Sequence, residues 1–78
     1  MGFKISNIYL FLAVDPNGDE SVPAFSEGDV FMPLMGTDPA RVDELREIAK
    51  QMSRESGIKI TLCRFSVRED LEVINRRH

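Results

Sequence analysis

Potential metal ligands are densest between residues 15 and 20 of this chain. Four side chains there offer carboxylate or amide oxygens, the ligands that calcium prefers: Asp15, Asn17, Asp19 and Glu20. The spacing differs from that of a calcium-binding loop, because Pro16 stiffens its start, Gly18 is out of place and no glutamate follows at the twelfth position. We therefore interpret the segment as a solvated turn and predict no metal site.

Covalent catalysis would need an activated nucleophile, and the chain has one cysteine and one histidine, Cys63 and His78. Cys63 stands in an alternating apolar run without a base placed beside it, so we expect a small buried hydrophobe. His78 is the final residue, a position that is commonly disordered. The five glycines are scattered and form neither a P-loop nor a dinucleotide fingerprint. We predict no catalytic residue, no cofactor and no enzymatic activity.

A basic patch near the C-terminus is the remaining chemical candidate, since four arginines gather there: Arg64, Arg68, Arg76 and Arg77. Three acids lie among them and favour local ion pairs over an open patch: Glu69, Asp70 and Glu72. The formal net charge of -3 also argues against general nucleic-acid binding, which relies on clustered cations. Nucleic acid is therefore not the expected main partner.

The clearest element in the sequence is an amphipathic helix over residues 38–56. Asp38 suits the N-cap, Pro39 the first helical position and Gly57 the left-handed stop. Five apolar residues recur at spacings of three and four on one stripe: Val42, Leu45, Ile48, Ala49 and Met52. The opposite face is charged and spaced for ion pairs between residues three apart: Asp43 with Arg46, and Glu47 with Lys50. Such a helix must cover an apolar surface.

Strands are predicted on both sides of this helix. Residues 5–14 are apolar in both alternating sets, which is typical of a central strand. Asp15-Pro16-Asn17-Gly18 is a strong turn signal, so residues 20–25 should return as a hairpin arm at an edge. A further short strand is expected at residues 30–34, and a strand with two apolar faces at residues 58–65.

The two faces of the predicted sheet differ in composition. One set is aliphatic and matches the helix stripe, so we expect the helix to cover it: Ile8, Leu10, Leu12, Ile60 and Leu62. The other set would be incompletely covered: Tyr9, Phe11, Cys63 and Phe65. Exposed aromatic side chains usually mark a contact surface, so we predict that these four, with Arg64 and Arg68, bind a protein partner or a second copy. The alternative is that residues 25–35 complete an ordinary core there.

Residues after the last strand are predicted to form a short helix. Ser66-Val67-Arg68-Glu69 fits a capping box, and Val67, Leu71 and Ile74 recur at helical spacing. The sequence thus predicts one α+β domain over residues 1–78: a mostly antiparallel sheet of three or four strands, the long helix on one face and a short C-terminal helix at its margin. A chain of this size buries only roughly 60–65% of its unfolded surface, so self-association or a partner would stabilise it.

The compartment is predicted from what the chain lacks. One cysteine excludes an internal disulfide, no signal peptide is recognisable, and no apolar run reaches the ~18 residues of a membrane span. These features predict a cytoplasmic protein without membrane contact.

Three segments of the chain resemble short uncharacterised single-domain proteins of bacterial and phage genomes: Val22-Pro23-Ala24-Phe25, Met32-Pro33-Leu34 and residues 64–71. The resemblance includes no catalytic motif and transfers no activity. It implies a context in which small acidic products occupy the surface of a host protein. We accordingly expect a non-enzymatic protein-binding module that acts as an inhibitor or adaptor. The alternative is a homo-oligomeric domain that binds nucleic acid or a small ligand through its C-terminal arginines.

Overall fold

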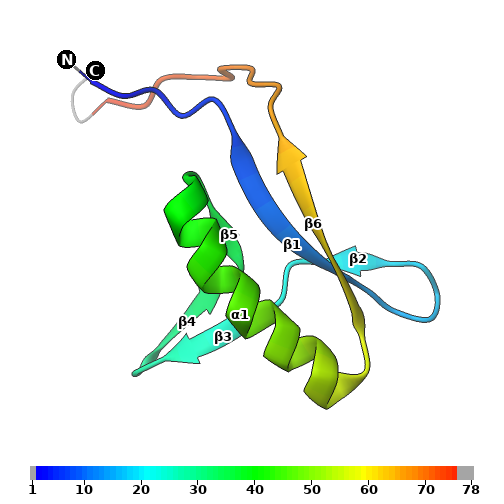
Figure 1. The fold of residues 1–78 in the computed structure, drawn as a ribbon. Helices are drawn as coiled ribbons and strands as arrows, with labels where there is room; N and C mark the ends of the chain where they lie inside the picture. Colours follow the sequence, from blue (N-terminus) through cyan, green and yellow to red (C-terminus); the bar gives the residue numbers. More distant parts are fainter. Residues whose placement is uncertain (1, 76–78) are drawn as a thin grey trace.

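A computed structural model describes residues 2–75 and shows one helix packed on an antiparallel sheet (Figure 1). The elements in chain order are β1 (Ile8–Val14), β2 (Glu20–Ser21), β3 (Ala24–Glu27), β4 (Val30–Pro33), β5 (Met35–Gly36), α1 (Pro39–Ser56) and β6 (Lys59–Phe65). Four strands form the main sheet, and β3 and β4 form a separate two-stranded sheet. The predicted α+β class is confirmed.

β1 is the central strand of the main sheet. Along one edge it pairs antiparallel with β6 over its whole length, from Ile8 opposite Phe65 to Val14 opposite Lys59. Along the other edge it pairs with two short strands, β2 near its end and β5 near its start. A strand with neighbours on both edges can be apolar in both alternating sets, which is the pattern that predicted this position.

The predicted turn after β1 is confirmed. The single strand predicted at residues 20–25, its return arm, is instead split between β2 and the start of β3. Gly18 has a φ of 88°, and its N–H donates to the Asp15 carbonyl at 2.9 Å. The Asp15 carboxylate accepts two further backbone N–H groups, also at 2.9 Å. The arm pairs with β1 only over the two residues of β2. Pro23 has no N–H for the ladder, and the chain leaves the main sheet there to form β3.

α1 has the ends and the apolar stripe that the sequence predicts. The Asp38 carboxylate accepts the backbone N–H of Arg41 at 3.1 Å, and Gly57 takes the left-handed conformation with a φ of 75°. Three stripe residues are buried and two are partly buried against them: Val42, Leu45 and Ala49, then Ile48 and Met52. The helix therefore has satisfied ends and a single buried face.

The core lies between α1 and one face of β1. Its buried members are Phe11, Leu34, Val42, Leu45 and Ala49, with Phe25 and Tyr9 packed against them. Leu34 joins three segments, because its carbonyl accepts the Phe11 N–H at 3.0 Å and its own N–H donates to the Pro23 carbonyl at 2.9 Å. Part of segment 25–35 therefore completes the core beneath α1. The alternative expectation placed this segment over the sheet face opposite the helix, and the structure does not show that arrangement.

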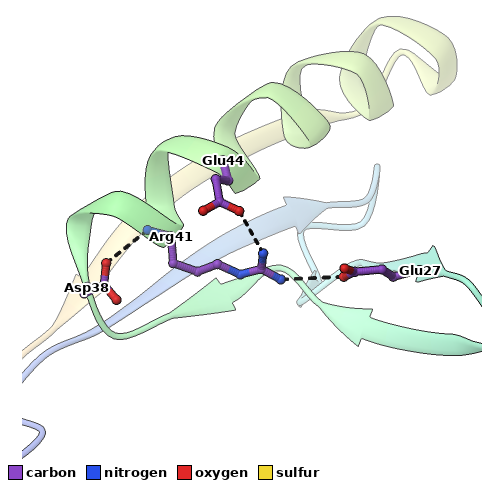
Figure 2. Close-up of polar contacts among 4 residues, drawn as sticks. All are labelled: Glu27, Asp38, Arg41 and Glu44. Carbon is purple, nitrogen blue, oxygen red and sulfur yellow. Dashed lines mark hydrogen bonds and ion pairs between the residues drawn. The ribbon is translucent and has the colours of Figure 1, made fainter.

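Arg41 connects α1 to the β3–β4 hairpin (Figure 2). Its guanidinium lies 3.2 Å from the Glu44 carboxylate on the helix and 3.8 Å from the Glu27 carboxylate on β3. The side chain passes closely over Gly36, where an added Cβ would lie 3.1 Å from the Arg41 Cγ. These carboxylates are largely exposed, so each ion pair contributes no more than about 1 kcal/mol.

The expectation that α1 covers the aliphatic set of β1 is wrong. The register places Phe11 opposite Leu62, and Leu10 opposite Cys63. Facing residues of an antiparallel pair lie on the same side of the sheet, so Ile60 and Leu62 share a face with Phe11 and not with Leu10. α1 packs on that face. A shift of one residue in register exchanges the two faces of a strand, and neither strand is polar enough on one side to specify which face is buried.

The predicted C-terminal helix is also wrong, because residues 66–75 contain no helix. Arg68 Nε donates to the Asp70 carboxylate at 2.8 Å, a contact between residues two apart that a helix would place on different faces. A two-turn helix needs tertiary packing to be stable. Val67 and Leu71 are 96% and 83% exposed, so no such packing exists in the described chain. The expected capping box does not form.

Candidate protein-interaction site

The face of the main sheet opposite α1 has no second layer within residues 2–75 (Figure 1). We call it the open face, and the pairing assigns seven apolar residues to it: Ile8, Leu10, Leu12 and Val14 of β1, Met35 of β5, and Cys63 and Phe65 of β6. The β1 residues are half-buried by neighbouring strands, whereas Met35 is 39% and Phe65 is 53% exposed at the margins. An apolar patch of this extent usually marks an interaction site.

Beyond the sheet, residues 2–7 and 66–75 lead away from it in the same direction without regular secondary structure, and we call these two segments the terminal arm (Figure 1). The Arg68 guanidinium donates to the Ile5 carbonyl at 3.5 Å. It is a side-chain contact, and the backbone pairing of β1 with β6 ends at Ile8 and Phe65. The apolar side chains of the arm are all more than half exposed: Phe3, Ile5, Val67, Leu71, Val73 and Ile74.

The open face and the terminal arm are continuous. A hollow of about 620 Å³ lies where they meet, and residues of both line it, among them Ile5, Ile8, Phe65 and Val67. Arg68, like Glu69 and Asp70, adds polar atoms to its rim. The apolar surface therefore extends from the sheet along the arm.

The total surface of the chain is large for its mass. A compact monomer of 8.9 kDa exposes about 4,800 Å², whereas this chain exposes 6791 Å². Its radius of gyration is 15.2 Å, against about 11.5 Å for a compact domain of the same length. The excess is larger than the roughly 800 Å² that one partner buries in a standard protein–protein interface.

A second surface, which we call the basic groove, lies between α1 and β6 on the covered side of the sheet. The groove has a volume of about 350 Å³ and an apolar floor formed by Phe11, Ala49, Ile60 and Leu62. Three cations spaced four residues apart on α1 also line the groove: Arg46 and Lys50, which pair with Asp43 and Glu47, and Arg54. Beside it, the outer edge of β6 is unpaired within the described chain. An unpaired edge presents backbone donors and acceptors to another strand.

The predicted aromatic site is divided between the two faces of the sheet. Tyr9 and Phe11 lie beneath α1, and Phe11 is 3% exposed, so it cannot contact a partner in the folded chain. Cys63 and Phe65 lie on the open face. The prediction that these four residues share one surface is therefore wrong, and the cause is the register described above.

The predicted arginines are also separated. Arg64 faces Tyr9 on the covered side of the sheet, whereas Arg68 lies in the terminal arm and pairs with Asp70 at 2.8 Å. Local pairing of Arg68 is thus confirmed. Residues 76–78, which include the remaining two arginines and His78, lie outside the described residues.

Sequence reasoning missed the residues that the structure brings together. Met35 belongs to the open face only because β5 pairs with β1, and no local pattern predicts that pairing. The cations of the basic groove had a detectable signal, since residues 46, 50 and 54 repeat at an interval of four on a predicted helix. Whether these cations line a groove depends on the position of β6, which follows the helix in the sequence.

A metal-binding cluster is not observed in residues 2–75. Within that range no three His, Cys, Asp or Glu side chains are grouped to hold a metal ion. The described helix is too polar to cross a membrane. Comparison with protein-family models, with curated proteins and with solved structures finds no match for this chain. The candidate site is therefore defined by its geometry alone.

Proposed function

We propose that this chain is a small non-enzymatic protein-binding module whose open face docks on an apolar surface of a protein partner. The observation that carries the proposal is an apolar sheet face without a second layer. A sheet face that is apolar is normally covered by a helix or by another sheet. A partner that supplies this layer would gain the hydrophobic free energy that the chain itself leaves unused.

The composition of the open face favours a protein over other ligands. Its centre is apolar, and charged neighbours occur at the Val14 end, where Glu20 and Lys59 pair with it on either side. An apolar centre with a polar rim is the usual anatomy of a protein–protein interface. The face has no cluster of cations for phosphate groups, and the net charge of the chain is negative.

The proposed role is that of an inhibitor or adaptor on a host protein, as expected for a phage or mobile-element product. Its support is the sequence resemblance described above, together with a site that needs no catalytic group. A module that acts by occupying a surface requires only a stable scaffold and an exposed apolar face. This chain has a packed core beneath α1 and an apolar sheet face without a second layer in residues 2–75.

Matched glutamate substitutions test the open face. Immobilised wild-type protein is used to capture host proteins, and each captured protein is purified and titrated by calorimetry. Met35→Glu should weaken binding at least about tenfold, because it places a charge within the interface. The control is Phe31→Glu, at an apolar residue on β4 that lies outside the open face and is more exposed than Met35, 75% against 39%. Equal binding by both variants, with unchanged circular dichroism, would contradict the proposal.

A further inference from the structure

The last strand, β6, is followed directly by residues 66–75 of the terminal arm. Residues 66–75 follow β6 without regular secondary structure, and the Arg68 guanidinium donates to the Ile5 carbonyl at 3.5 Å. Residues 59–75 contain no proline and no glycine, so no residue of the kind that interrupts a strand is present. One edge of β6, the first part of this long segment, pairs with β1. The other edge is unpaired in the described chain.

The two halves of the long segment carry opposite charge. β6 contains Lys59 and Arg64 and no acid, and the basic groove beside it adds three cations from α1. Residues 69–74 contain Glu69, Asp70 and Glu72 and no cation. Opposite charges across neighbouring strands are stabilising and like charges are destabilising. The edge of β6 therefore suits an acidic strand better than a second β6.

We propose that two copies of this chain pair antiparallel along residues 59–75, about a two-fold axis at Val67. In this register Asp70 faces Arg64 of the second copy, and Ile74 faces Ile60 of the second copy. Glu72 then faces Leu62, beside the cations of the basic groove. No like charges face each other anywhere in the pairing. This inference concerns a different surface from the open face and goes beyond the proposed function.

The pairing also accounts for the apolar residues of the arm. Alternate residues of a strand lie on one side, so Val67, Leu71 and Val73 fall on the same side as Cys63 and Phe65. Two paired copies would then join their open faces into one continuous apolar surface. The excess surface of the isolated chain exceeds what each partner buries in a standard dimer.

A second copy fits this edge better than the chain's own C-terminal segment. To fold back on β6 in the same register, the chain would need a three-residue loop of Ser66, Val67 and Arg68. Such loops need a residue in the left-handed conformation, which is normally glycine. None is present, and Arg68 instead contacts Ile5 and Asp70. The edge of β6 is thus left for another molecule.

Reversing the charge of Arg64 or of Asp70, which face each other in the proposed dimer, tests the proposal by sedimentation equilibrium. The wild-type chain should be a dimer. Arg64→Asp or Asp70→Arg should each raise the dissociation constant about ten- to a hundredfold, since two facing pairs per dimer become repulsive. An equimolar mixture of the two variants should restore dimerisation, because both pairs are then opposite in charge. Asp29→Arg, the same change at the exposed β3–β4 turn, is the control.

If the chain instead folded back on itself, the wild type would be monomeric, and mixing the Arg64→Asp and Asp70→Arg variants would not restore a dimer. Either result overturns the proposal. Met35→Glu should leave the dimer intact, so the failure of the partner-binding proposal and the failure of this one are separate outcomes.

A crosslink at the two-fold axis provides an independent test. Facing residues of an antiparallel pair have Cα atoms roughly 4.5–5.5 Å apart, within the range that a disulfide spans. In a Cys63→Ser background, Val67→Cys should therefore form a disulfide-linked dimer under mild oxidation. Phe31→Cys in the same background is the control: this position is also exposed, and the variant should remain largely monomeric. Equal crosslinking of the two variants would overturn the proposed axis.

Discussion

Leu10 and Phe11 are neighbours in β1 and lie in different environments. Phe11 lies beneath α1 among Leu34, Leu45 and the other core residues. Leu10 lies on the open face, where Met35 and Cys63 flank it and no described element covers it. The molecule has one helix for a strand that is apolar on both sides. One face therefore became the core, and the other remains available for another molecule.

The largest expected effect separates these two residues. Phe11→Ala should lower the free energy of unfolding by about 3–5 kcal/mol, because it removes a buried ring and leaves a cavity. Leu10→Ala should cost roughly 1 kcal/mol, since the side chain is partly exposed on the open face and its loss leaves no enclosed space. Urea denaturation of the two variants measures both. Equal midpoints would show that the open face is covered in solution.

The next comparison sets the two predicted helix starts against each other. Asp38→Ala should destabilise the chain by about 0.5–2 kcal/mol, because its carboxylate accepts the Arg41 N–H. Ser66→Ala should have almost no effect, since residues 66–75 form no helix. Thermal unfolding reports both. A loss at Ser66 as large as that at Asp38 would indicate that the C-terminal helix forms in solution.

The smallest expected effect concerns the β3–β4 hairpin. A double-mutant cycle of Glu27→Ala and Arg41→Ala should give a coupling energy of roughly 0.2–0.5 kcal/mol, because the ion pair is 3.8 Å long and largely exposed. The cycle of Glu47→Ala and Lys50→Ala, a pair within α1, is the matched local control. A coupling well above 1 kcal/mol for Glu27 would mean that the hairpin depends on Arg41 for its position.

The local elements were predictable because their signals are local. The cap at Asp38, the stop at Gly57 and the apolar stripe between them lie within one stretch of chain, and all are confirmed. The turn after β1 is confirmed for the same reason, since Asp15 and Gly18 close it through their own backbone. Backbone conformation and capping depend on neighbours within a few residues.

The candidate site was only partly predictable. Cys63 and Phe65 were assigned to an exposed surface and do lie on the open face. Their expected companions Tyr9 and Phe11 lie on the other side, because the pairing of β1 with β6 joins segments separated by the entire helix. No local pattern distinguishes the two possible faces when both are apolar.

The amino-acid sequence by itself determined the α+β class, the long helix with its buried stripe, the central strand and the turn that follows it. The tertiary structure alone decided which face of β1 became the core, where Met35 joined the sheet, and that residues 66–75 form no helix. The physical reason is that a helix stripe can be satisfied by any apolar surface of adequate size. Which surface it covers depends on register and on the long-range packing of Leu34 and Phe11. A short amphipathic segment that finds no such surface does not become a helix.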